Sequence, residues 1–413
     1  MTVPVPGSAD DRFAAFRYAA YRLFWVARFS TSLAIQIVSV AVGWQIYDLT
    51  HDPADLGIVG LVQFMPLLLL ALVTGSVADR YGRRNVMALA LLAQLGCALA
   101  ILVYSYNGLT SPVPVFIALT GFGVARAFFG PASQSLVVNL VPTEVFPNAV
   151  AWNSSSWQVA SIGGPVLGGL LYGAGASTAY GVAVGLYLLA SLLVVRVPQP
   201  AQPAAVATTD LSSVFDGLRF IRREKVVLGA ISLDLFAVMC GGAVALLPVY
   251  ARDVLELGPI GLGWLRAAPG IGALLMAGYL ATAPFKDHAG RILLVFVALF
   301  GLSTVLFGLS TITWLSILAL GLVGATDMVS VYVRETLLQL WTPDAVRGRV
   351  NAVNMVFLGA SNELGEFRAG MMAAWLGAVP AVVFGGVGAV AIAGLWAWLF
   401  PALRDTRHLD RRG

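Results

Sequence analysis

Apolar runs of about 20 residues recur along the whole chain, and this pattern limits the possible folds more than any other feature. One run reads LGIVGLVQFMPLLLLALVTGSVA, at residues 56–78. A helix of this length crosses the hydrocarbon core of a bilayer, which is roughly 30 Å thick. We count twelve runs, centred near residues 35, 67, 96, 126, 160, 186, 240, 270, 299, 326, 360 and 390. Because strand-like alternation is lacking, the sequence predicts an all-α integral membrane protein with twelve transmembrane helices.

The composition excludes a soluble protein of this size. Of 413 residues, 59% are hydrophobic and 11% are charged, which is too few charges to cover a surface exposed to water. Both cysteines lie inside apolar runs, and the three histidines lie in loops or the tail. We therefore expect neither a disulfide framework, nor a metal site, nor another cofactor. An enzyme is not expected either, because no nucleophile–base constellation and no large extramembrane segment are evident.

Basic residues gather in one set of the predicted loops and in both tails. The opposite loops hold acidic residues and a single basic residue, Arg252. Cytoplasmic loops of membrane proteins carry an excess of Lys and Arg, so we expect both termini to be cytoplasmic, in a bacterial-type plasma membrane. The net charge of +4 is then a signal of topology, and no nucleic-acid partner is expected. The predicted cytoplasmic loops contain Arg80, Arg83, Arg84, Arg196, Arg219, Arg222, Arg223, Lys225, Lys286, Arg291, Arg347 and Arg349.

The chain divides between the sixth and seventh predicted helices. The segment PQPAQPAAVATTDLSS, at 198–213, is rich in Pro, Ala and Thr and is typical of a linker. It leads into SVFDGLRFIRREK, at 213–225, whose Val214, Leu218 and Ile221 share one helical face. This pattern predicts an amphipathic helix along the cytoplasmic surface. We expect a six-helix half at 1–197, a cytoplasmic linker at 198–225, and a second half with a cytoplasmic tail at 226–413.

The two halves resemble repeats of one another. The pentapeptide DRYGR at 79–83 recurs as DHAGR at 287–291. Likewise, LVPTEV around Pro142 recurs as WTPDAV around Pro343, and at this second spacing Gly164 and Gly169 correspond to Gly365 and Gly370. Parallel six-helix repeats are typical of transporters, which bind substrate near the bilayer midplane between the two halves. We therefore expect two pseudo-symmetric halves around a central substrate site.

Nine ionisable side chains fall inside the predicted transmembrane helices. A charge at the bilayer centre costs roughly 3 kcal/mol or more, so such residues face the interior, pair with one another or lose their charge. Acids outnumber bases among them, so the residues cannot all form one-to-one ion pairs. We therefore expect at least one acid to be protonated in part of the transport cycle. The nine residues are Arg126, Asp234, Arg266, Asp327, Arg334, Glu335, Glu363, Glu366 and Arg368.

Two of these acids, Glu363 and Glu366, stand three residues apart in the stretch SNELGEFRAG and therefore share one helical face. A carboxyl in an apolar cavity prefers its neutral form, whereas an approaching arginine favours the ionised form. We predict that at least one of four acids carries a coupled proton; a static ion-pair network with Arg334 or Arg368 is the alternative. The four acids are Asp234, Asp327, Glu363 and Glu366, with Arg126, Arg334 and Arg368 as candidate partners. Arg334 and Glu335 lie nearer the cytoplasmic end and are also candidates for a gate pair.

Polar side chains inside the predicted helices are candidates for the lining of a substrate cavity. Ser32, Gln36 and Ser39 recur at helical spacing in the first helix. Amides and hydroxyls also serve as ordinary contacts between membrane helices, and this alternative stays open. The candidate cavity residues are Gln36, Asn153, Trp157, Asn354 and Asn362.

Several motifs resemble those of a known family. The segment GSVADRYGRR, at 75–84, resembles the cytoplasmic loop motif of the major facilitator superfamily, G-x-x-x-D-R-x-G-R-R. The segment SIGGPVLGG, at 161–169, resembles the antiporter motif of that family, G-x-x-x-G-P-x-x-G-G, although Ala160 replaces the first glycine. The motif residues present here are Gly164, Pro165, Gly168 and Gly169.

Further segments point to one branch of this superfamily. Arg126 with Gly130 resembles the intramembrane R-x-x-x-G motif of the family, although Phe129 stands where many members have Gln. The segments at 21–25, SLDLFAV at 232–238 and TPDAVRGRV at 342–350 are similar to enterobactin-exporter-like and drug:proton antiporter-like efflux proteins.

The resemblance implies a secondary active transporter that exports a small organic compound by proton antiport and alternating access. Its substrate would be drug-like, siderophore-like or another amphipathic metabolite, and a proton gradient would supply the energy without a cofactor. The expected partners are the lipid bilayer, the substrate and protons, and the expected state is a monomer. Proton-coupled uptake, lipid or lysolipid flipping on the same scaffold, and a non-transporting receptor-like protein are the alternatives.

The family motifs also imply roles for particular residues. In the predicted cytoplasmic gate, an aspartate accepts hydrogen bonds at a helix N-terminus and an arginine pairs with an acid of a neighbouring helix. The glycines and the proline of the antiporter motif imply a bend that biases the rocking of the two halves, with general helix packing as the alternative. The predicted gate residues are Asp79, Gly82, Arg83, Asp287 and Arg291.

Overall fold

The computed structural model describes residues 11–199, 211–283, 285 and 287–406. Within these ranges every regular element is a helix, as the sequence predicts for an all-α chain. The side chain of Asp79 lies outside the described part of the structure, as do residues 200–210 of the predicted linker.

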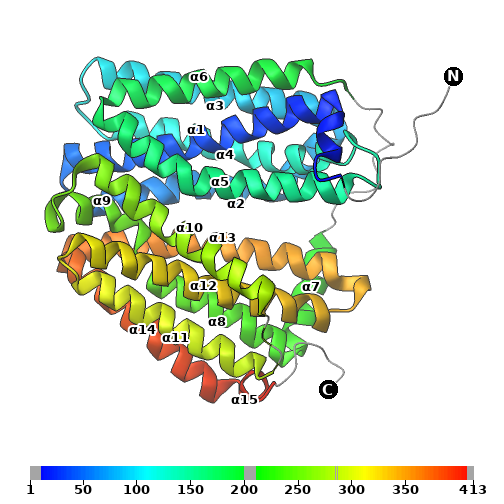
Figure 1. Cartoon of the computed structure of the whole chain (residues 1–413), viewed down its shortest axis with the longest axis vertical. Coiled ribbons are helices and arrows are strands. Elements are labelled where there is room, and N and C mark those ends of the chain that lie inside the picture. The colour runs from blue at the N-terminus through cyan, green and yellow to red at the C-terminus, as the bar shows by residue number, and fades with distance from the viewer. Residues whose placement is uncertain (1–10, 200–210, 284, 286, 407–413) are drawn as a thin grey trace.

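The helices form two bundles, which Figure 1 shows as an upper group in blue to green and a lower group in green to red. The first bundle consists of η1 (Ala14–Arg17), α1 (Ala19–Thr50), α2 (Pro53–Tyr81), α3 (Arg83–Tyr106), α4 (Val113–Val137), α5 (Phe146–Gly173) and α6 (Ala176–Arg196). The second consists of α8 (Lys225–Gly241), η2 (Val244–Leu246), α9 (Leu247–Val249), the π-helical turn η3 (Tyr250–Val254), α10 (Gly258–Thr282), α11 (Ala289–Leu309), α12 (Thr313–Trp341), α13 (Asp344–Leu376), α14 (Ala378–Leu399) and α15 (Pro401–Arg404).

Ten helical segments of the described chain are long and apolar enough to cross a membrane. Two helices at expected spans, α5 and α13, are not among the ten, although they have 28 and 33 residues. Their polar and charged residues lower the hydropathy of the helix. Both helices pack against the opposite bundle: α5 contacts α10, and α13 contacts α2. The ten apolar spans are confirmed, and the total of twelve stays a prediction.

Local sequence signals explain several helix ends. Asp52 precedes α2 and accepts a hydrogen bond from the backbone N–H of Ala54 at 2.9 Å, with Pro53 in the first turn. Gly82 separates α2 from α3 with φ +89°, a conformation that costs a side-chain-bearing residue free energy. The glycine of the cytoplasmic loop motif is therefore required for the sharp break between these two helices.

The predicted amphipathic helix is present as α7, Leu211–Arg223. Its Ile221 and Leu218 belong to a cluster with Val227 of α8, Leu338 of α12 and Val353 of α13. Its apolar face therefore packs against the second bundle, beside the predicted linker. The side chain of Val214, the third predicted member of this face, lies outside the described part.

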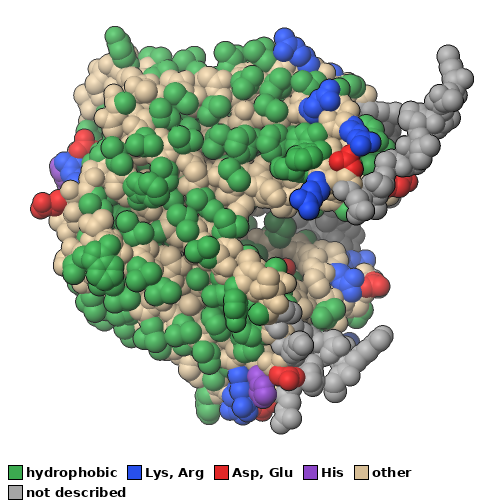
Figure 2. Space-filling model, viewed as in Figure 1, with side chains coloured by type: hydrophobic (Ala, Val, Ile, Leu, Met, Phe, Trp, Pro, Cys, Tyr) green, Lys and Arg blue, Asp and Glu red, His purple; other side chains and the backbone are tan. Residues whose placement is uncertain are grey.

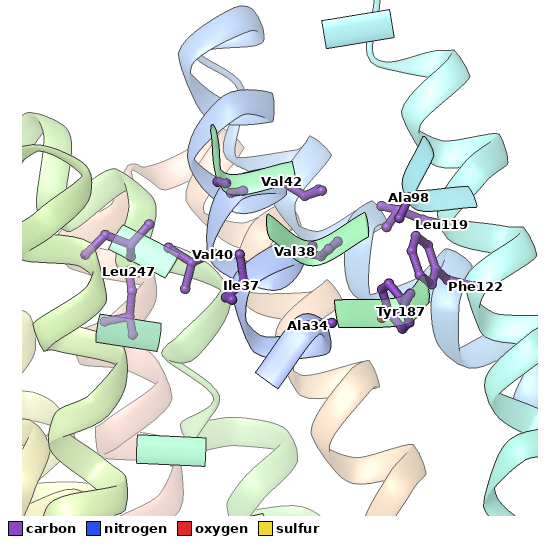
Figure 3. Close-up of a cluster of buried hydrophobic side chains, with 14 of the residues drawn as sticks. Ala34, Ile37, Val38, Val40, Val42, Ala98, Leu119, Phe122, Tyr187 and Leu247 are labelled. Carbon is purple, nitrogen blue, oxygen red and sulfur yellow. The ribbon is translucent and has the colours of Figure 1, made fainter. Parts of the chain in front are cut away.

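The helix α1 separates the core of the first bundle from the second bundle. In the close-up of Figure 3, Ala34 and Val38 lie on the side of Tyr187, whereas Ile37 and Val40 lie toward Leu247 of α9. All six side chains are buried. The helix α1 thus packs apolar residues both into its own bundle and against the second bundle. Its polar residues Gln36 and Ser39 face the cavity between the bundles.

The two bundles touch at one end of the molecule and separate at the other. At the closed end, Arg252 of η3 pairs with Asp48 of α1, and the Tyr47 hydroxyl donates a hydrogen bond to Asp253. We refer to these four residues as the outer closure, because the distribution of basic residues predicts that this end faces the outside. Figure 2 shows the surface hollowed between the bundles at the other end, where α7 lies. This open end is the one that the distribution of basic residues assigns to the cytoplasm.

Candidate functional site

A central cavity of about 400 Å³ lies between the two bundles. Its walls come from α1, α2, α4, α5 and α6 on one side and from η2, α10 and α13 on the other. A cavity of this volume is within the range that holds drug-sized ligands. It occupies the position that internal repeats predict for a substrate site.

Four charged side chains line this cavity: Arg126 of α4, Arg266 of α10, and Glu363 and Glu366 of α13. The two glutamates converge on Gly60 of α2. A Cβ atom added to Gly60 would lie 2.8 Å from Oε2 of Glu363 and 3.5 Å from Oε2 of Glu366. The missing side chain of Gly60 therefore leaves the space that the two carboxyl groups use.

The two arginines approach this acid pair from different helices. Arg266 reaches the first bundle, where its Nη1 donates to Oγ of Ser39 at 2.5 Å, while its Nε is buried without a hydrogen-bond partner. Arg126 makes no hydrogen bond or ion pair with any residue that the structure describes. Neither arginine lies within 4.0 Å of a glutamate carboxylate as an ion pair. The cavity thus holds two guanidinium and two carboxyl groups that are near one another but not joined.

Uncharged polar and aromatic groups complete the lining. Gln36 and Trp157 line the cavity as the sequence predicts, and the Trp157 side chain is 46% exposed. Tyr187 of α6 also lines it; the residue is fully buried and its hydroxyl has no hydrogen-bond partner in the described part of the chain. Sequence reasoning missed Tyr187 as a site residue, because a tyrosine in an apolar helix gives no local signal of a cavity.

Three predicted cavity residues lie elsewhere. Asn153 is buried beside Tyr21, whose hydroxyl is 3.5 Å from its Oδ1. Asn354 is also buried, and its Nδ2 donates to Oε1 of Glu335 at 3.0 Å. Asn362 lines a different cavity. The structure therefore does not bring these three residues to the central cavity: Asn153 and Asn354 are buried against neighbouring helices, and Asn362 faces the second cavity.

That second cavity, of about 170 Å³, lies inside the second bundle. Apolar residues such as Phe300 form most of its wall, and its acids are Asp327 of α12 and Glu366 of α13. Glu366 also lines the central cavity. This glutamate therefore connects the space between the bundles with the space that contains Asp327.

The remaining intramembrane charges form separate groups. Arg334 is buried and pairs with Asp234, and its Nε lies 3.8 Å from Oε1 of Glu335. Arg368 donates from Nε to the carbonyl of Met239 at 2.9 Å and from Nη2 to the carbonyl of Cys240, near the end of α8. A cation at the C-terminus of a helix stabilises the last carbonyl groups. Arg368 is therefore placed at a helix end and not beside the two glutamates.

The glycines of the antiporter motif bring α5 close to two other helices. A Cβ on Gly164 would lie 2.6 Å from Cβ of Gln36 in α1, and one on Gly169 would lie 2.5 Å from the carbonyl oxygen of Pro259 in α10. In the second bundle, a Cβ on Gly370 of α13 would lie 2.8 Å from Cα of Gly57 in α2. The two glycines that correspond in the repeat thus make equivalent crossings between the bundles. The bend predicted at Pro165 stays a prediction.

The predicted gate is described only in part. Arg83 donates from Nη1 to the carbonyl of Ser135 at 3.0 Å, near the end of α4 in its own bundle. Asp287 and Arg291 lie at the start of α11, and both are exposed. Since the side chain of Asp79 lies outside the described part, the gating role of these residues stays a prediction.

Two helical bundles around a central polar cavity define a membrane transporter with the major facilitator fold. A bacterial homologue of the human lysosomal transporter Spinster, solved in an inward-facing and unoccupied conformation, has a TM-score of 0.71 at 15% identity, over 96% of this chain and 99% of that one. A mutant of the nucleoside transporter NupG has a TM-score of 0.72 at 13% identity, over 92% of this chain and 100% of that one. At these identities the likeness concerns the fold alone.

The chain belongs to the transmembrane secretion effector family of the major facilitator superfamily, whose model matches residues 10–412. Similar curated proteins include the enterobactin exporter EntS of Escherichia coli O9:H4 (strain HS), which is 28% identical over 401 residues, 95% of this chain and 94% of the relative. The exporter of the same name from Shigella dysenteriae serotype 1 (strain Sd197) is 27% identical over equal shares. The resemblance to enterobactin-exporter-like proteins is thereby confirmed, and the chain is a transporter and not an enzyme.

Proposed function

We propose that this protein exports a small organic compound across a bacterial plasma membrane in exchange for protons, by alternating access of the central cavity. One observation carries the proposal: Glu363 and Glu366 face the same small space between the bundles, and no arginine of the described chain forms an ion pair with either. The exporter names of the similar proteins support the direction of transport. Enterobactin, the compound in those names, is a first candidate substrate.

The acid pair has the properties of a proton carrier. Two ionised carboxylates in close proximity repel each other, so the pair is most stable with one shared proton. Arg126 belongs to the first bundle and Glu363 to the second. Rocking of the bundles changes the distance between Arg126 and Glu363. An approaching guanidinium group stabilises the ionised carboxylate. The conformational change would therefore drive proton release.

Glu366 is the acid that we assign to carry the proton. It lines the central cavity, where a substrate group competes with the proton for its carboxylate, and also the smaller cavity that contains Asp327. A proton that passes from Asp327 to Glu366 would not cross the space that the substrate occupies. Asp234 is a weaker candidate because it is already paired with Arg334.

Glu366→Gln tests this assignment, because the glutamine resembles the neutral glutamic acid permanently. In proteoliposomes we expect the variant to exchange enterobactin across the membrane but to lose export driven by a pH gradient by at least about tenfold. Glu144→Gln, which changes an exposed glutamate, is the matched control. Gradient-driven export at the wild-type rate would exclude Glu366 as the carrier.

The same preparations separate this role from a purely structural one. The structural alternative is a static ion pair between Glu366 and an arginine, and removal of one member of such a buried pair costs roughly 3 kcal/mol or more. A structural role therefore predicts that Glu366→Gln lowers the melting temperature and all modes of transport together. A proton-carrying role predicts an unchanged melting temperature and a loss confined to coupled transport.

A further inference from the structure

We infer that the central cavity selects ligands in which an anionic group and an ammonium group, separated by a short apolar chain, are attached to an aromatic body. The anion would bind Arg126 and the Tyr187 hydroxyl, and the ammonium would bind Glu363 and Glu366. This inference takes the cavity to be the substrate site of the proposed exporter, and it adds a further class of substrate to enterobactin, which has no ammonium group.

The wall formed by the first bundle offers unused hydrogen-bond donors. The guanidinium group of Arg126 has no partner among the described residues, and the Tyr187 hydroxyl is buried without one. Tyr187 and Arg126 both line the central cavity from the first bundle. A buried donor without a partner costs free energy, and a planar guanidinium group beside a hydroxyl suits a carboxylate or a similar anion.

The wall formed by the second bundle offers acceptors. An ionised carboxylate only accepts hydrogen bonds, and the carboxyl groups of Glu363 and Glu366 face the space beside Gly60. An ammonium group supplies three donors and a positive charge, so it satisfies both carboxylates at once. It also competes with a proton for the same oxygen atoms, which is the competition that antiport requires.

The balance of charges explains why both groups are needed. With both glutamates ionised, the positive charges of the two arginines and the negative charges of the two glutamates sum to zero. A ligand with one charge leaves part of this set without a partner and is repelled by the like charges opposite. Arg266 already donates to Ser39, so Arg126 is the arginine with the most capacity for an anion. A zwitterion with separated charges serves both walls and keeps the cavity neutral.

The remaining lining suits an aromatic body. Trp157, Phe122 and Leu119 also line the central cavity. Aromatic rings pack against such surfaces in stacked or edge-on geometry. The volume of about 400 Å³ accommodates a body of this kind with its two polar groups.

A matched set of fluorescent probes tests the inference. Nα-dansyl-lysine carries a carboxylate and a separated ammonium, dansylcadaverine is the same molecule without the carboxylate, and Nα-dansyl-norleucine lacks only the ammonium. Binding to the full-length protein in nanodiscs is measured by fluorescence, with empty nanodiscs as the blank. We expect the Kd of Nα-dansyl-lysine to be at least about tenfold lower than that of either singly charged probe. An equal or lower Kd for a singly charged probe would overturn the inference.

Variants assign each end of the probe. Arg126→Gln should raise the Kd of Nα-dansyl-lysine about tenfold, to the level of dansylcadaverine, and should not weaken dansylcadaverine itself. Glu366→Gln should raise the Kd of Nα-dansyl-lysine to the Kd of Nα-dansyl-norleucine. Tyr187→Phe removes only a hydroxyl and preserves the fold. It should weaken the binding of the two probes that carry a carboxylate and leave the binding of dansylcadaverine unchanged. An equal loss for all three probes in these variants would contradict the assignment. Arg196→Gln, at an exposed position, is the control.

These measurements use no gradient and are therefore independent of the proposed antiport. Probe selectivity without gradient-driven export would support the ligand class and refute the proposed coupling. Gradient-driven export of enterobactin without selectivity among the probes would refute the ligand class and support the coupling.

Discussion

At the scale of single residues, the site depends as much on an absent side chain as on the charged ones. Gly60 lies opposite the two glutamates, and its lack of a Cβ atom leaves room for both carboxyl groups. Arg266 is similarly placed against Gly43, where an added Cβ would lie 3.2 Å from Nη2. Small residues in membrane helices usually permit helix contact; here they also give space to charged side chains.

Gly60→Ala should therefore impair transport while the fold persists. The new methyl group would displace the end of a flexible glutamate side chain and would not meet backbone, so the protein should fold with a melting temperature within about 3 °C of the wild type. We expect coupled export to fall at least about threefold, because the acid pair loses its geometry. Gly181→Ala is the matched control, since an added Cβ there has open space. Unchanged export by Gly60→Ala would show that the position of the acid pair is not critical.

At the scale of elements, the crossing of α5 with α10 holds the bundles together at close range. Gly169 and Gly263 face each other, and a Cβ on Gly263 would lie 2.6 Å from the carbonyl oxygen of Pro165. The contact is made by backbone atoms on both sides, so a larger residue forces the helices apart. The glycine motif is thus explained by contact between helices of different bundles.

Gly169→Ala should destabilise the protein by about 1–3 kcal/mol, because an overpacked contact with backbone has no low-energy relaxation. The measurement is thermal unfolding in detergent, compared with Gly163→Ala in the same helix, where an added Cβ meets nothing within 4 Å. Equal melting temperatures for the two variants would contradict the close crossing of α5 and α10.

At the scale of the whole molecule, the bundles are closed at one end by few polar contacts. The outer closure joins α1 to the π-helical turn η3 through Arg252 and Asp48 and through Tyr47 and Asp253. An exposed ion pair contributes about 0.2–1 kcal/mol, and a hydrogen bond contributes about 1 kcal/mol. Opening toward this side therefore has a small polar cost, which is consistent with the proposed alternating access.

The double variant Arg252→Gln with Tyr47→Phe removes the outer closure. It should raise the population of the state that is open at this end by about 5- to 30-fold. A cysteine placed at Gln36 in the central cavity reports this shift through its rate of labelling by an impermeant maleimide added outside the cell. The background replaces Cys97 and Cys240 with alanine. Arg404→Gln, which removes an exposed pair with Asp405 at the other end, is the control. An unchanged labelling rate would mean that other contacts hold this end closed.

Much of the fold follows from local features of the sequence. The length of an apolar run determines whether a helix spans a bilayer, and Asp52 and Gly82 mark helix ends through hydrogen bonding and backbone conformation. The internal repeat places Gly169 and Gly370 at equivalent crossings. These features were predictable because each depends on neighbouring residues or on a pattern along the chain.

The sequence by itself determined that this protein is a helical membrane transporter with acids inside the membrane. Only the tertiary structure decided which charges meet. Glu363 and Glu366 face Gly60 of the opposite bundle, whereas Arg368, two residues beyond Glu366, reaches the end of α8. Helical spacing specifies which residues share a face, but not the rotation of that face or the helix that packs against it. Those choices come from the close packing of glycines and apolar side chains between helices far apart in the chain.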